Sequence, residues 1–214
     1  RFNKAGFTIH SGVYKARPDV NCVMHTHTRA GTGISVLKKG LRPISQDALA
    51  VYDEVVYHEY GMPTSEEECE ALGVTCQHGS AVVLRNHGLL SVGATVPAAL
   101  RRLYMLERAC EVEIIARGLD EEPAPIDDEV VRRYGERARQ QRASPEFGVS
   151  DWKAALRLIE GKGMLRFHHV LDPALRRRLF VFEHYSALIE ERKPGSSDCG
   201  CDGAYRSRLC GRRC

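Results

Sequence analysis

The sequence predicts an α/β domain followed by a basic tail of different character. Over the first 163 residues, short β-branched and apolar runs alternate with longer segments of helical periodicity. A length of 214 residues with 43% hydrophobic residues suits one closed core rather than two. After residue 163 the sequence becomes rich in cysteine, glycine and arginine, and its apolar residues show no periodicity. We therefore expect one domain over residues 1–163 and a separate tail over residues 164–214.

The first half of the domain alternates helices and strands. Residues 7–14 predict a short helix that ends before Pro18, because proline moves its preceding residue out of helical geometry. Residues 20–27 predict a strand and residues 30–38 a helix ended by Gly40. Two short strands are expected at 44–50 and 55–60. Ser65 then caps a helix to residue 72, with glutamates in its first turn.

The second half continues this alternation. Residues 80–85 and 89–92 are apolar runs around an Asn-His-Gly turn, which predicts a hairpin or sharp reversal at His87. Thr95 caps a long helix to about residue 117, where Gly118 ends it. Its apolar stripe is expected to pack on the sheet and its charges to face water. Residues 127–142 predict a solvated helix, and residues 152–159 a short amphipathic one.

Charge and cysteine usage exclude several classes of function. The formal net charge of +3 comes from the tail, and a near-neutral domain argues against nucleic-acid binding. No run approaches the roughly 18 apolar residues of a membrane span, and the first residues lack a secretion signal. Four cysteines are scattered through the domain, as expected for reduced thiols in a cytoplasmic protein. They are Cys22, Cys69, Cys76 and Cys110.

Three histidines form the constellation that suggests chemistry. His25 and His27 are separated by one residue in a predicted strand, so both imidazoles lie on the same face. An isolated pair of this kind is more often two polar residues at a sheet edge. His87 changes this interpretation, because it supplies a third imidazole from a turn between apolar strands, where an unpaired polar group is costly. We therefore predict a site for zinc or another divalent metal at these three residues.

The other histidines of the domain are interpreted as structural or surface residues. His10 lies on the first predicted helix and is expected to be structural. His58 and His78 are expected at the surface. The long helix carries a group of residues that we interpret as an ordinary helix face rather than a site, namely Tyr104, Glu107, Cys110 and Glu111.

Several separated motifs resemble those of the class II aldolase/adducin family. In chain order they are NKAGF at 3–7, IHS at 9–11, RPD at 17–19, VMHTHT at 23–28, GL at 40–41, SQ at 45–46 and LRNHG at 84–88. The resemblance runs from residue 3 to about 160 and is strongest to the adducin-like side of the family. It implies a three-layer α/β/α fold with a central, mainly antiparallel sheet. It also implies a homo-oligomer, often a tetramer with active sites between subunits.

The resemblance also implies a zinc held by three histidines in the family's enzymes, at the positions of His25, His27 and His87. The family's first strands and its phosphate-binding, glycine-rich segment are expected to precede Arg1. The family's aldolases carry a glutamate, and related epimerases an aspartate, at the position of Gly6. Glycine cannot move a proton, so the catalytic acid is unknown from the sequence.

Four residues after the first histidine pair are candidates to replace that acid. They are Asp47, Glu54, Tyr57 and Glu59. For each, a solvated loop charge or a surface tyrosine is the competing interpretation, and the one that general residue statistics favour.

The sequence leaves three interpretations open, and two of them are functions from different classes. The first is a metal-dependent aldehyde-lyase acting on a small hydroxy-carbonyl, sugar-phosphate-like substrate. The alternative is a non-catalytic, adducin-like interaction module of the cytoskeletal, actin-binding type, which retains the fold without the acid. A third is a nonfunctional fragment. The tail, with Cys199, Cys201, Cys210 and Cys214, is interpreted as a disordered or unrelated extension rather than a metal knuckle.

Overall fold

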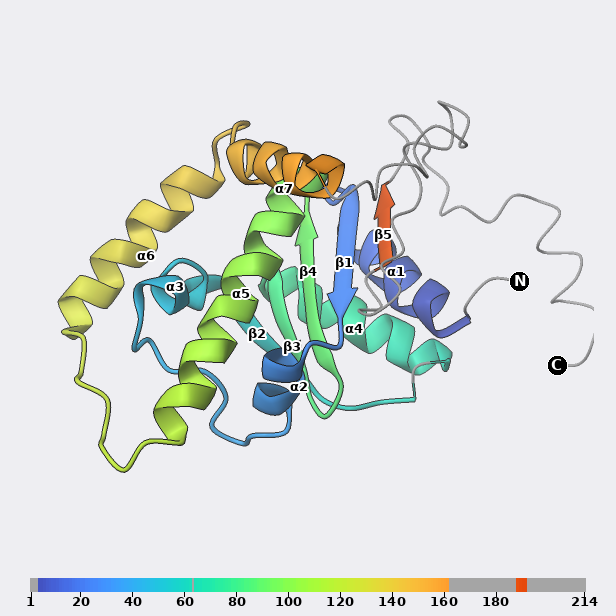
Figure 1. Ribbon diagram of the computed structural model, residues 1–214. Helices are drawn as coiled ribbons and strands as arrows, with labels where there is room; N and C mark the ends of the chain where they lie inside the picture. The colour runs from blue at the N-terminus through green and yellow to red at the C-terminus, as the bar shows by residue number, and fades with distance from the viewer. Residues whose placement is uncertain (1–3, 63, 162–187, 192–214) are drawn as a thin grey trace, which may run out of the picture.

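The computed structural model describes residues 4–62, 64–161 and 188–191, which form helices on both faces of one sheet (Figure 1). The elements in chain order are α1 (Lys4–Ala16), β1 (Cys22–Thr26), α2 (Arg29–Ser35), α3 (Gln46–Leu49), the short 3-10 helix η1 (Tyr52–Glu54), β2 (Val55–His58), α4 (Glu66–His78), β3 (Ala81–Leu84), β4 (Gly88–Gly93), α5 (Val96–Arg117), α6 (Asp128–Arg142), α7 (Val149–Gly161) and β5 (Leu188–Glu191).

The sheet has the strand order β2-β3-β4-β1-β5 and is mainly antiparallel. Only β2 and β3 are parallel; the other neighbours run in opposite directions. In the central pair, Cys22 of β1 lies opposite Gly93 of β4, and Thr26 lies opposite Leu89. Every residue of β1, β3 and β4 is buried, which requires cover on both faces. The predicted three-layer α/β/α architecture is confirmed.

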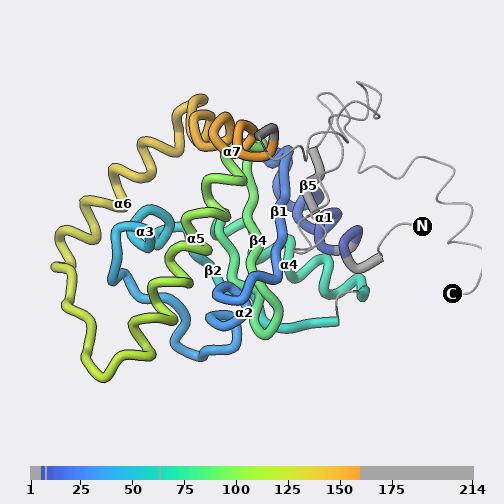
Figure 2. The backbone as a smooth tube through the Cα atoms, viewed as in Figure 1, coloured from blue at the N-terminus to red at the C-terminus, as the bar shows by residue number. Residues whose placement is uncertain are grey.

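Alternate residues of β1 point into two separate cores. Met24 packs in the core that includes residues of α2, α3 and α5, whereas Val23 packs in the core that includes residues of α1 and α4. Figures 1 and 2 show α5 crossing one face of the sheet and α4 the other. His25 has the same parity as Val23, so its side chain belongs to the face of α1 and α4.

Helices α1 and α4 approach each other backbone to backbone. A Cβ at Gly12 of α1 would overlap the carbonyl oxygen of Cys69 on α4. A Cβ at Gly73 of α4 would lie 2.7 Å from the carbonyl oxygen of Gly12. Two glycines facing each other therefore set the spacing of this layer.

The strand predicted at residues 44–50 is wrong, because this segment contains helix α3. The Ser45 hydroxyl accepts a hydrogen bond from the Ala48 amide at 3.1 Å and caps the turn. Ala48 and Leu49 are buried as a result. The local cap therefore decides the conformation of this short run. The helices predicted from Ser65 and at residues 152–159 are both longer than expected.

The expectation that all charges of α5 face water is wrong for Glu113. This residue is fully buried, and its carboxylate accepts hydrogen bonds from Arg42 Nε at 2.8 Å and Arg117 Nε at 2.7 Å. The backbone amide of Arg42 also donates to it. Because the partners satisfy the buried charge, Glu113 fixes the loop after α2 on helix α5.

Most of the tail lies outside the residues that the structure describes. Residues 188–191 form β5, which pairs with β1. The expectations for residues 162–187 and 192–214, including the four tail cysteines, fall outside those ranges, as does any segment before Arg1. Within residues 4–62, 64–161 and 188–191, no helix combines the length and apolar character needed to cross a membrane.

Candidate metal centre

The three predicted histidines come from neighbouring strand ends. His25 lies in β1, His27 follows the last residue of that strand, and His87 directly precedes β4. Since β1 and β4 are antiparallel neighbours, the end of β1 lies beside the start of β4. A Cβ at Gly88 would overlap the carbonyl oxygen of Thr26, so glycine is needed here for the two backbones to meet.

The turn that carries His87 is held by its backbone. Asn86 has a φ of +57°, a left-handed conformation that asparagine tolerates better than most residues. Its amide donates to the Ser35 carbonyl at 3.1 Å, and the His87 amide donates to the Leu84 carbonyl at 3.1 Å. These bonds fix the turn against β3 and the end of α2, which positions the imidazole of His87.

The structure brings the three imidazoles together. Their ring centroids are 4.6 Å apart for His25 and His27, 4.7 Å for His25 and His87, and 4.6 Å for His27 and His87. One nitrogen from each ring falls within a group whose members all lie within 4.8 Å of one another. In the part of the chain that the structure describes, no carboxylate or thiol joins this cluster.

The tautomer of His25 follows from its hydrogen bond to the Leu89 carbonyl. Its Nδ1 lies 2.8 Å from the Leu89 carbonyl oxygen, which only accepts, so Nδ1 carries the proton and donates. The lone pair of Nε2 therefore points into the cluster, 2.7 Å from Nε2 of His27. A backbone carbonyl that orients a histidine in this way is typical of metal ligands.

Electrostatics keeps two of these rings neutral, which is the form that binds metal. Burial, and after it the neighbouring His87 and His27, lower the pKa of His25 to about 3, although the hydrogen bond that its Nδ1 donates to the Leu89 carbonyl opposes the shift. Burial also lowers the pKa of His87; His27 adds to this shift, whereas the carboxylate of Glu68 opposes it. His25 is buried, His87 is half-buried and His27 is exposed, so the cluster is open on one side.

Three of the four candidate acids make contacts outside the histidine cluster. Asp47 pairs with an arginine of α5, and the Tyr57 hydroxyl accepts from the Leu41 amide at 2.8 Å. Glu54 is not the solvated charge that the sequence suggested: it is largely buried between Arg102 and Arg142. The last two contacts hold α5 and α6 to the segment before β2.

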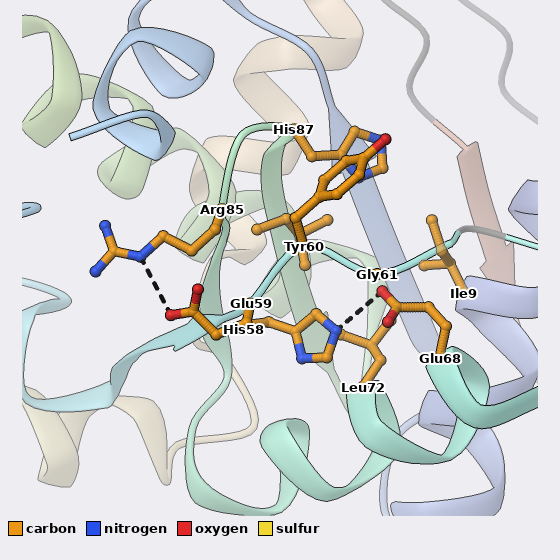
Figure 3. Close-up of a pocket in the computed structure, with 10 residues that line it drawn as sticks. Ile9, His58, Glu59, Tyr60, Gly61, Glu68, Leu72, Arg85 and His87 are labelled. Atoms are coloured by element: carbon orange, nitrogen blue, oxygen red, sulfur yellow. Dashed lines mark hydrogen bonds and ion pairs between the residues drawn. The ribbon is translucent and has the colours of Figure 1, made fainter. Parts of the chain in front are cut away.

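The remaining candidate borders a small pocket beside His87 (Figure 3). Glu59 lines this pocket, but its side chain is 88% exposed and its closest ion pair is with Arg85 at 3.8 Å. Gly6 is buried on α1, four residues before His10, and has no side chain to offer. The catalytic acid therefore has to be sought among residues that the sequence did not single out.

His58 is such a residue, and the prediction that it lies at the surface is wrong. It is only 6% exposed, and its Nε2 lies 3.0 Å from Oε1 of Glu68 in the same pocket (Figure 3). Its Nδ1 lies 2.8 Å from the hydroxyl of Thr75. The parallel pairing of β2 with β3 buries His58 beside the turn that carries His87. The one available sequence signal was its place within the strand predicted at residues 55–60.

Comparisons with known proteins agree with this architecture. Residues 1–114 match the family described as Class II Aldolase and Adducin N-terminal domain. The chain is 38% identical to alpha-adducin from Rattus norvegicus over 191 residues, which is 82% of this chain and 25% of that protein.

Two solved structures are similar at the level of the fold and the sequence. One is an aldolase II superfamily protein from Pseudomonas syringae, with a TM-score of 0.70, 37% identity and coverage of 76% of this chain and 65% of that one. The other is the L-fuculose 1-phosphate aldolase from Glaciozyma antarctica, with a TM-score of 0.56, 35% identity and coverage of 69% and 58%. The chain thus spans a quarter of the adducin and less than two thirds of each of these two solved chains.

Proposed function

The chain belongs to the class II aldolase and adducin family, and from that premise we propose that it is a metal-dependent aldehyde-lyase. In this proposal His25, His27 and His87 hold a divalent ion, zinc in the first place. The substrate is a small hydroxy-carbonyl compound of the sugar-phosphate type, as in the aldolase that the fold resembles. The proposal includes a homo-oligomer, a tetramer by family resemblance. From the cysteine usage and charge of the sequence it also includes a cytoplasmic location with no nucleic-acid or membrane partner.

The observation that supports the metal most directly is the convergence of three imidazoles. Three nitrogen ligands with an open side are the donor set of a catalytic zinc site. Nε2 of His25 and Nε2 of His27 lie 2.7 Å apart, so both nitrogens would face one bound ion once His27 carries its proton on Nδ1. When bound there, a divalent ion would supply polarisation of a substrate carbonyl.

The protein's own residues contribute orientation and access. The Leu89 carbonyl fixes the His25 ring, and the turn at Asn86 fixes His87. His27, the exposed member, borders the side from which a substrate approaches. Tyr60 lies beside His87, with ring centroids 6.5 Å apart, and is positioned to contact a molecule bound at this opening.

One observation favours a second candidate, a non-catalytic adducin-like interaction module. The position of the family's acid is Gly6, and alpha-adducin is among the similar proteins. A protein of this kind would keep the histidines and the fold while losing proton transfer.

Cleavage assays on the metal-loaded chain separate the two candidates. Wild-type protein saturated with zinc is offered a panel of phosphorylated hydroxy-ketones and hydroxy-aldehydes, and aldehyde release is measured. The enzyme proposal expects cleavage by wild type and by His78→Ala, a control at an exposed histidine, but not by His25→Ala. Equal rates from His25→Ala and wild type would remove the histidine cluster from the mechanism. Metal-loaded protein that cleaves nothing in the panel would favour the interaction module.

A further inference from the structure

The carboxylate of Glu68 lies in the pocket beside His87, although its position in the sequence predicts a role in capping a helix. Glu68 stands three residues after Ser65 at the start of α4, the spacing of a capping box. The Ser65 hydroxyl accepts from the Glu68 amide at 3.1 Å, as that motif requires. The reciprocal bond is missing, however, because the Ser65 amide donates to the Met62 carbonyl at 2.9 Å instead. The carboxylate of Glu68 is therefore released from capping.

The released carboxylate is fixed in the pocket by His58. Nε2 of His58 and Oε1 of Glu68 lie 3.0 Å apart, and their side chains are only 7% and 15% exposed. Contact between these two atoms requires one proton between them, on either the imidazole or the carboxyl group. The hydroxyl of Thr75, 2.8 Å from Nδ1, fixes the other side of the ring. The pair is thus a rigid, proton-carrying unit.

The second carboxylate oxygen lies against the backbone of Gly61. A Cβ at Gly61 would overlap Oε2 of Glu68, so only glycine leaves room for this carboxylate. Among the residues that the structure describes, Oε2 has no hydrogen-bond or ion-pair partner. Figure 3 shows the carboxylate beside Gly61, on the side of the pocket where Ile9 also lies.

The same pocket connects this unit to the histidine cluster. His58, Glu68, Tyr60 and His87 all line it, and its interior has room for about one water molecule. This neighbourhood follows from the topology, because β2 and β3 are parallel and both end at the edge where His87 turns into β4. General acid–base transfer proceeds directly or through one water molecule, so a water in this pocket would provide a route for a proton between the carboxylate and the cluster.

We propose that Glu68 is the proton-transfer residue of the candidate metal centre, in place of the acid missing at Gly6, and that His58 is its positioning residue. This inference rests on the proposed lyase function. Glu68 takes a proton from the carbon next to the carbonyl of the bound hydroxy-carbonyl compound. The carbon–hydrogen bond breaks, its electron pair forms a carbon–carbon double bond, and the carbonyl oxygen gains the negative charge. The reverse step returns the proton from Glu68 to the same carbon.

The test measures proton exchange without requiring a known aldehyde partner. Zinc-loaded protein is mixed with dihydroxyacetone phosphate in D2O, and loss of the hydrogen beside the carbonyl is followed by proton NMR. Glu68→Gln keeps the size of the side chain and removes its basicity. We expect exchange to fall about 10²- to 10⁴-fold in this variant. Glu67→Gln, the same change one residue earlier at an exposed position, should exchange at the wild-type rate.

Metal content, measured on each variant, provides the readout that does not depend on turnover. Glu68→Gln should keep the zinc equivalent of wild type, because Glu68 lies outside the ligand cluster. Loss of zinc in this variant would overturn the proposal, since Glu68 would then support the site rather than move a proton. Wild-type exchange by Glu68→Gln with zinc retained would also overturn it, while leaving the lyase function standing. If zinc-loaded wild type shows no exchange, the lyase function and the role of Glu68 fail together.

Two further variants protect the test against misfolding and separate the two roles. Glu68→Asp keeps the charge but draws it back by one methylene, so its exchange should lie between wild type and Glu68→Gln. His58→Gln should lower the maximal exchange rate without raising the half-saturating concentration of dihydroxyacetone phosphate. A merely structural loss would raise that concentration as well, and this result would contradict the positioning role. Circular dichroism melting checks that each variant is folded.

Discussion

Acid should destabilise the metal-free protein through His25, and the structure gives the size of the effect. Burial lowers the pKa of this ring from its ordinary 6.5 to about 3. In the unfolded chain His25 takes up a proton near pH 6.5, whereas in the folded protein it stays neutral down to about pH 3. The unfolded state therefore binds more protons in this window. Stability is fully present above pH 6.5 and falls as the pH drops towards 3.

The size of this loss follows from the difference between the pKa values of His25 in the folded and the unfolded state. Each pH unit within the window costs about 1.4 kcal/mol of the free energy of unfolding. At about pH 5, roughly one and a half units below the unfolded pKa, the loss is about 2 kcal/mol. For a domain of this size that corresponds to a melting temperature lower by about 4–8 °C. The lowered pKa of His87 acts in the same direction.

Urea unfolding of chelator-treated protein at about pH 7.5 and pH 5 measures this loss. The matched variant is His25→Asn, because asparagine keeps a donor for the Leu89 carbonyl but does not titrate. Its stability should fall by about 2 kcal/mol less than that of wild type between the two pH values. If both proteins lose the same free energy, His25 titrates alike in the folded and unfolded states, and the account of its burial is refuted.

Three other predictions concern packing and burial in the domain. Gly73→Ala should destabilise it by about 1–3 kcal/mol, because the new Cβ would lie 2.7 Å from the Gly12 carbonyl oxygen and 3.0 Å from Cβ of Ala16. Gly135→Ala in α6 meets nothing closer than 3.5 Å and should stabilise by up to about 1 kcal/mol. Urea unfolding measures both, and an unaffected Gly73→Ala protein would contradict the close approach of α1 and α4. Iodoacetamide should leave Cys76 unmodified in the native state, because this thiol is buried and burial raises its pKa to about 12. Peptide mass spectrometry before and after urea measures the labelling, and rapid modification of the native protein would show that the thiol is accessible.

The convergence of the three histidines was accessible from the sequence because local rules determine it. Strand alternation places His25 and His27 on one face, and an Asn-His-Gly turn between two apolar strands reverses the chain at His87. The missing step was the pairing of β1 with β4, which brings the strand end and the turn together. The family resemblance supplied that step, and the fold confirms it.

The proton-carrying unit was not accessible in the same way. Glu68 has the sequence signature of a capping box, and only the diversion of the Ser65 amide to Met62 shows that its carboxylate is free of that role. His58 is buried by the parallel pairing of β2 and β3, a long-range contact without a local signal. Glu113 is a similar case, since its two arginine partners come from different parts of the chain. Local periodicity predicts elements but not which charges are buried between them.

The metal content of the purified chain decides whether His25, His27 and His87 form a metal site. Elemental analysis is made on wild type, His87→Ala and the surface control His78→Ala. We expect close to one equivalent of a divalent metal in wild type and in the control, and loss of that equivalent in His87→Ala. Full occupancy in His87→Ala, or no bound metal in wild type supplied with zinc, would contradict it.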